Sequence, residues 1–159
     1  MHIRMLVIKT WCAGWTTSHR MHESKLHECL FGCRGEQDNI AYYLRCPYLW
    51  DTLDRVVLGE ASSRPRAGIA PLHRLGMFPP DQGAMQSLAL AFSVYHAIKN
   101  QSSHLLEHAF ASQDFSFIHA TTQKLASMYA HDLGIINFPS SASKSSGLGS
   151  GRMPSLTNH

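Results

Sequence analysis

The sequence has no long hydrophobic run. Nowhere do its 159 residues approach the roughly 20 consecutive apolar residues that a membrane-spanning helix needs, so we expect no contact with a membrane. The N-terminal stretch MHIRMLVIKTWC holds only one short apolar run, Met5 to Ile8, and it lacks the apolar core and cleavage site of a secretory signal. We therefore expect a soluble intracellular protein, nuclear or cytoplasmic rather than secreted.

The chain also lacks a concentrated excess of charge. Its net charge is only +3, and residues 1–60 carry equal numbers of basic and acidic side chains. Proteins that bind nucleic acid through phosphate contacts usually present a concentrated basic face. Composition alone therefore gives nucleic-acid binding only weak support.

Along much of the chain, apolar residues recur at the spacing of a helix face. They predict helices over residues 5–15, 38–45, 47–58, 85–101, 103–111 and 115–133, with Asp38 as the N-cap of the second. Residues 61–84 are rich in proline and glycine and predict an irregular connector. Residues 139–159 are rich in serine and glycine and predict a disordered tail. We expect an all-α fold: a small irregular helical domain in which residues 85–134 pack on residues 1–60.

Three of the four cysteines lie in one short segment, CLFGCRGEQDNIAYYLRCP, at residues 29–47. Cys29 and Cys33 are separated by three residues that include Gly32, a spacing that lets a tight, zinc-finger-like turn point two thiolates at one ion. Cys46 follows at the end of the helix predicted from Asp38. In a chain without an export signal, clustered cysteines are more often metal ligands than disulfides.

These cysteines are part of a longer pattern: WCAGWTTSHRMH, then CLFGC, then DNIAYYLRCPYLW. The pattern resembles the carboxy-terminal zinc-binding region of non-LTR retrotransposon reverse transcriptases, which has Cys-x3-Cys, an acidic residue, His-x3-Cys and Pro-x-Leu-Trp. The resemblance covers roughly residues 9–50, within a zinc-binding-like region that we assign to residues 1–60. It implies that Cys29, Cys33 and Cys46 are zinc ligands and that Asp38 opens a helix.

The fourth ligand of the family pattern is missing. Tyr42 stands where the family has a histidine, and a neutral phenol, with an ordinary pKa near 10, is a poorer zinc ligand than imidazole. The substitute fourth ligands that the sequence offers are His27, His22, His19 and Cys12. Two alternatives stay open: a zinc site completed by a substitute donor, and a metal-free cluster of buried thiols.

The resemblance also implies a function. It indicates a non-catalytic carboxy-terminal fragment of a retroelement reverse transcriptase, whose ancestral role is zinc-supported binding of RNA or DNA. The chain contains no Asp-Asp pair for polymerisation and no endonuclease set, so we expect neither enzyme activity nor a small-molecule substrate. The candidates for phosphate contact are Arg34, Arg45, Arg20 and Lys9.

A second interpretation comes from a different class of protein. In it the chain is a metal-free helical protein or a decayed retroelement fragment, with no present biochemical activity or with protein-interaction surfaces alone. Trp11, Trp15 and Trp50 could stack on bases. Their helical spacing and apolar neighbours favour positions in the core instead.

Overall fold

A computed structural model of the whole chain describes residues 2–18, 20–22, 27–58, 74–75, 82–101 and 103–136. Its helices are α1 (Ile3–Trp11), α2 (Ile40–Tyr43), α3 (Pro47–Leu58), α5 (Gln82–Lys99), α6 (Ser103–Ser112) and α7 (Ser116–Asp132). Within the described ranges there is no strand, and Glu28 and Gln37 form an isolated antiparallel bridge. The predicted all-α fold is confirmed.

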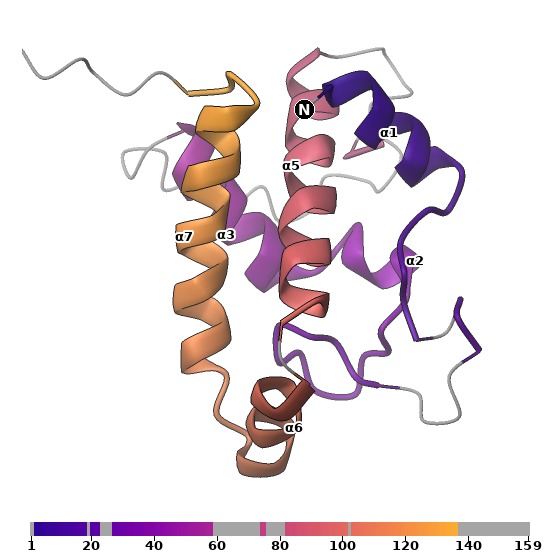
Figure 1. Cartoon of the computed structure of the whole chain (residues 1–159), viewed down its shortest axis with the longest axis vertical. Coiled ribbons are helices and arrows are strands. Elements are labelled where there is room, and N and C mark those ends of the chain that lie inside the picture. The colour runs from indigo at the N-terminus through magenta and orange to yellow at the C-terminus, as the bar shows by residue number, and fades with distance from the viewer. Residues whose placement is uncertain are drawn as a thin grey trace, which may run out of the picture.

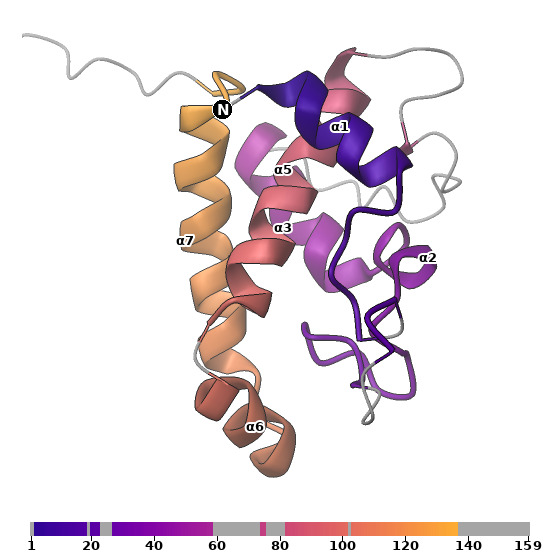
Figure 2. The same cartoon turned by 45° about the vertical axis from the view of Figure 1, so that its right-hand side comes forward.

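Helix α5 is the central element. It packs against α1, α3 and α7, and α3 also packs against α7. Both views show α1 and α7 on opposite sides of α5 (Figures 1 and 2). The middle of α5 is buried on nearly all sides, from Leu88 to Tyr95, as expected for a helix that is apolar all round. No helix among the described residues combines the length and hydrophobicity that crossing a membrane requires.

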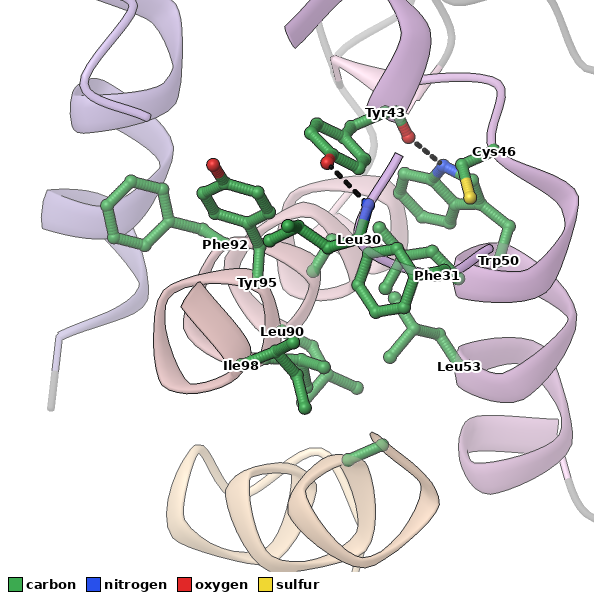
Figure 3. Close-up of a cluster of buried hydrophobic side chains, with 14 of the residues drawn as sticks. Leu30, Phe31, Tyr43, Cys46, Trp50, Leu53, Leu90, Phe92, Tyr95 and Ile98 are labelled. Carbon is green, nitrogen blue, oxygen red and sulfur yellow. Dashed lines mark hydrogen bonds between the residues drawn. The ribbon is translucent and has the colours of Figure 1, made fainter. Parts of the chain in front are cut away.

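The core contains a cluster of aromatic rings around Trp15. This side chain is 1% exposed, and its ring centroid lies 4.6 Å from that of Tyr95 and 5.6 Å from that of Tyr43. Figure 3 shows Leu30 and Phe31 lying between the rings of Tyr43 and Tyr95 and the side chains of α3. The loop that carries the first two cysteines therefore contributes to the core itself.

The tryptophan prediction is right for two residues and wrong for the third. Trp15 and Trp50 are buried, whereas Trp11 is 45% exposed and its indole Nε1 donates a hydrogen bond to the carbonyl of Leu75, at 2.9 Å. The reason is that α1 ends at Trp11. Ala13 then takes a left-handed conformation with φ of 54°, so Trp11 and Trp15 do not share a helical face.

Local chemistry explains the bounds of two further helices. Helix α3 has the predicted bounds, because Pro47 is tolerated in a first helical turn and cannot continue a preceding helix. The second helix begins later than predicted, since the side chain of Asn39, not Asp38, accepts the capping hydrogen bond from the Tyr42 backbone N–H. The predicted connector falls largely outside the described residues, and the predicted tail wholly outside them.

Candidate metal centre

The loop before α2 is held in a hairpin-like shape by its own backbone. The N–H of Cys29 donates to the carbonyl of Glu36, at 2.7 Å, and the N–H of Asp38 donates to the carbonyl of His27, at 2.9 Å. We call residues 27–38 the cysteine loop. Its base is closed by these bonds, so Cys29 and Cys33 are presented from a single compact turn.

Gly32 lets this turn pack tightly. Its φ of +82° lies in the left-handed region, which side chains rarely adopt. A Cβ atom at this position would also lie 2.6 Å from Cγ of Phe115, at the start of α7. The predicted need for a glycine between the two cysteines therefore has two causes, one in the turn and one in its packing.

Cys46 reaches the same place from the start of α3. Its carbonyl accepts a hydrogen bond from the N–H of Trp50, at 3.1 Å, so Cys46 lies at the N-terminus of that helix. Figure 3 shows Cys46 beside Trp50, whose Nε1 donates to the carbonyl of Tyr43 at 2.8 Å. Cys46 therefore lies next to the positive end of the α3 dipole.

The three cysteine sulfurs form a triangle of a size that suits a metal ion. The Sγ of Cys46 lies 3.8 Å from the Sγ of Cys29 and 3.7 Å from the Sγ of Cys33, and all three atoms lie within 4.8 Å of one another. Bonds of about 2.3 Å from zinc to sulfur in a tetrahedron place two sulfurs about 3.8 Å apart. The three cysteines can therefore bind a metal ion, and two edges of the triangle fit zinc without rearrangement.

The environment of the three thiols favours one negative charge among them. Interactions with the thiols of Cys29 and Cys46, of which the Cys46 Sγ lies 3.7 Å away, lower the pKa of Cys33 to about 3. Burial raises the pKa of Cys46 and of Tyr42. The site is closed to solvent, because Cys29 and Cys46 are 0% exposed and Cys33 is 8% exposed.

Of the predicted substitute ligands, His19 lies outside the described residues, and the structure does not bring His27, His22 or Cys12 to this site. Among the described residues, the group of close ligand atoms consists of the three cysteines alone. The ring of His27 is stacked on Phe110, with the ring centroids 6.0 Å apart. His22 is exposed in a left-handed conformation, and Cys12 is exposed just after α1.

The candidate phosphate-binding residues are all exposed, in different settings. Arg34 directly follows Cys33, and Arg45 directly precedes Cys46, so both lie beside the centre. The Arg45 guanidinium forms an ion pair with Glu36 at 3.4 Å and lies 5.4 Å from the centroid of the Tyr42 ring. Arg20 and Lys9 are exposed on other segments.

Sequence reasoning missed the principal structural role of Asp38. Its side chain is 0% exposed, and it does not cap α2 as predicted. Its carboxylate accepts hydrogen bonds from four groups in three parts of the chain. These are the Ser18 backbone N–H at 2.7 Å, the Tyr43 hydroxyl at 2.7 Å, the Tyr95 hydroxyl at 3.1 Å and the Lys99 ammonium at 3.2 Å. Asp38 thus connects the end of the cysteine loop to α5.

Helix α7 supports the cysteine loop from the other side. The Nε2 atom of His119 lies 2.9 Å from the carbonyl oxygen of Phe31, within hydrogen-bonding distance. The His119 ring is also stacked on Tyr48 of α3, with the centroids 4.7 Å apart. The loop is therefore fixed by direct protein contacts on both sides as well as by any metal.

No match to this chain is found among models of known protein families, among curated proteins or among solved structures. The resemblance to the reverse-transcriptase region therefore stays a prediction from the residues quoted above.

Proposed function

We propose that the chain is a non-catalytic zinc-binding module that binds nucleic acid. In this proposal Cys29, Cys33 and Cys46 hold the ion, and the exposed arginines beside them contact phosphates. The observation that carries the metal part is the pair of distances, 3.7 and 3.8 Å, between the sulfur of Cys46 and the other two sulfurs. Thiolate ligands in a tetrahedral arrangement favour zinc over calcium or magnesium, which prefer oxygen.

The metal would connect two elements that the fold already places together. Cys29 and Cys33 belong to the cysteine loop, and Cys46 belongs to the start of α3. An ion bound to all three would fix the loop relative to α3, and with it the two arginines next to the ligands. Because ligand thiols must lose their protons, binding would release protons and become weaker at low pH.

Nucleic-acid binding is supported by the resemblance and by the position of two cations. Arg34 and Arg45 flank the centre, and Arg45 is 63% exposed although it is paired with Glu36. An ion pair this exposed contributes little to stability, so a phosphate can replace the Glu36 carboxylate as the partner of Arg45 at low cost in free energy. With only a few cations, binding would be weak and would decrease strongly as salt is added.

The first test is the zinc content of the purified, reduced chain. We expect one zinc per chain in the parent and none in Cys46→Ser. Cys12→Ser is the matched control, because Cys12 is exposed and outside the three-sulfur group, so it should keep full zinc content. A parent chain that contains no zinc after purification and reconstitution would contradict the metal part of the proposal.

The second test is the salt dependence of binding to labelled single-stranded RNA and DNA, followed by fluorescence anisotropy. Removing two phosphate contacts with Arg34→Ala and Arg45→Ala together should weaken binding and reduce the slope of log K against log salt by about 1.4. Arg4→Ala, an exposed arginine on α1, is the control and should leave the slope unchanged. Equal slopes in the parent and the double variant would rule out these arginines as the phosphate contacts.

One observation favours the second candidate, a metal-free helical protein. The Cys46 thiol lies within hydrogen-bonding distance of the Cys29 and Cys33 thiols, at 3.8 and 3.7 Å, so the thiols have one another as partners without any ion. Such a protein could still interact through the apolar groove between α1 and α5, which is lined by Val7, Ile8, Trp11 and Met85. The zinc measurement separates the two candidates directly.

A further inference from the structure

An exposed aromatic ring is held in place beside the cysteine loop. Tyr48, in the first turn of α3, is 49% exposed. Its ring is stacked on that of His119, with the centroids 4.7 Å apart and 19° between the ring planes. Because Nε2 of His119 lies 2.9 Å from the carbonyl oxygen of Phe31, the stacked pair is anchored to the loop. A ring held in this way has little rotational freedom left to lose when it binds a flat ligand.

The stacked pair forms one end of a hollow between α3 and α7. The hollow has a volume of about 440 Å³, which is within the usual range for small-ligand sites. Two aromatic rings, two groups of opposite charge, one hydroxyl and one amide line it: Tyr48, His119, Asp51, Arg55, Thr52 and Gln123. A single nucleobase fits within this volume.

The polar groups of the hollow suit the edge of a base. The amide of Gln123 and the carboxylate of Asp51 offer the donors and acceptors that base edges pair with. The hydroxyl of Thr52 donates to the carbonyl of Tyr48 at 2.8 Å, so its oxygen can still accept a hydrogen bond. Asp51 and Arg55 carry opposite charges, which favours a neutral base over a free phosphate. A purely apolar partner fits less well, because it would leave these groups without hydrogen bonds.

The hollow also lies next to a proposed phosphate contact. The loop residue whose carbonyl contacts His119 is Phe31, and Arg34 follows it in the same loop. Arg34 and Arg55 are both exposed. Proteins that bind single strands combine cations along the backbone with aromatic rings on which bases stack. A strand that crosses the cysteine loop can therefore contact these arginines through phosphates and Tyr48 through a base.

We propose that Tyr48 is a stacking platform for one base of a single-stranded nucleic acid, and that the hollow between α3 and α7 holds that base. This inference rests on the proposed function, which supplies phosphate contacts but no contact to a base. Stacking is tolerant of sequence, because every base has a flat face. It requires an unpaired base, so the site favours single strands over a duplex.

The test measures binding of a fluorescein-labelled oligouridylate, and of the matching oligothymidylate, by fluorescence anisotropy. Tyr48→Leu removes the ring and Tyr48→Phe keeps it. We expect Tyr48→Leu to weaken binding by about 5-fold to 150-fold, and Tyr48→Phe by no more than about 2-fold. The slope of log K against log salt should stay unchanged in Tyr48→Leu, because no charge is removed. A strand of the same length without bases should bind the parent and Tyr48→Leu equally.

The control is Phe117→Leu, since Phe117 is 52% exposed on α7 and does not line the hollow. It should bind like the parent. Far-UV circular dichroism shows whether each variant is folded. Equal binding by the parent and a folded Tyr48→Leu variant overturns the platform and leaves the proposed function intact, whereas a parent that binds neither strand overturns both.

Photocrosslinking of the parent chain gives a second measurement that needs no variant. A strand that carries 5-iodouridine should crosslink to the peptide that contains Tyr48, identified by mass spectrometry. If Tyr48→Leu does not fold, this measurement decides. A parent that binds the strand and crosslinks only at other peptides overturns the platform.

Discussion

At the scale of the single residue, Asp38 has the largest structural role outside the cysteines. It is a fully buried carboxylate, and it accepts hydrogen bonds from two tyrosine hydroxyls, one backbone N–H and the Lys99 ammonium. Buried charges are stable only when they are paired and hydrogen-bonded, and Asp38 meets both conditions. Removing its charge breaks the ion pair with Lys99, whose side chain is 15% exposed.

We therefore predict that Asp38→Asn lowers the free energy of unfolding by about 3 kcal/mol, at the lower end of the range for breaking a buried ion pair, because Lys99 keeps some contact with water. Urea unfolding measures the loss. Asp132→Asn, at the exposed end of α7, is the control and should change stability by less than about 0.5 kcal/mol. Because the two side chains form an ion pair, the losses of unfolding free energy caused by Asp38→Asn and Lys99→Met should not add up in the double variant. Fully additive losses would contradict the ion pair.

At the scale of the element, the cysteine loop depends on two glycines in different ways. Gly32 and Gly35 both have positive φ, at +82° and +72°. A Cβ on Gly32 would meet the ring of Phe115, whereas a Cβ on Gly35 would have no atom within 4 Å. Comparing alanine substitutions at the two glycines therefore separates the energetic cost of the backbone conformation from the cost of packing against α7.

We predict that Gly35→Ala lowers the free energy of unfolding by about 1–2 kcal/mol, which is the usual cost of a left-handed conformation for a residue other than glycine. Gly32→Ala should lower it by about 1–3 kcal/mol more than Gly35→Ala does, because the added methyl group overlaps Phe115. Thermal unfolding of both variants measures the difference. Phe115→Leu combined with Gly32→Ala should recover part of it, and equal destabilisation by the two alanines would mean that the Phe115 contact does not constrain the loop.

At the scale of the whole molecule, we expect the helical core to form without the candidate metal. Helices α1, α3, α5 and α7 pack around Leu88, Leu90, Val94 and Ile98, all at most 1% exposed. The cysteine loop is itself fixed by Asp38 on one side and His119 on the other. Small zinc fingers, by contrast, are unfolded without their metal because they have little else to bury.

We predict that a chelator lowers the midpoint of thermal unfolding and leaves the far-UV circular dichroism nearly unchanged. The loss of unfolding free energy should equal the stabilisation that bound zinc supplies by mass action. This is about 2.7 kcal/mol if the free zinc concentration before chelation is 100 times the dissociation constant. Cys46→Ser should show no response to the chelator. A collapse of the helical signal on metal removal would mean that the core described here is not sufficient to hold the fold.

Local sequence patterns predict the parts of this fold that depend on contacts between residues close together in the chain. The bounds of α3 and the convergence of Cys29, Cys33 and Cys46 follow from proline chemistry and from spacing over fewer than 20 residues, and both are found in the structure. The role of Asp38 was not predictable in this way. Its partners Tyr95 and Lys99 lie 57 and 61 residues further along the chain, and no local pattern encodes such contacts.

The same difference in sequence separation bears on how the chain folds. Cys29 and Cys46 are 17 residues apart, whereas Asp38 and Lys99 are 61 apart. Loop-closure entropy grows with the logarithm of that separation, so the second contact costs about 1 kcal/mol more in chain entropy than the first. Residues 29–46 also leave the ribosome before α5 is made, because domains are synthesised from the N-terminus. The cysteine cluster can therefore assemble on a nascent chain, ahead of the core that later encloses it.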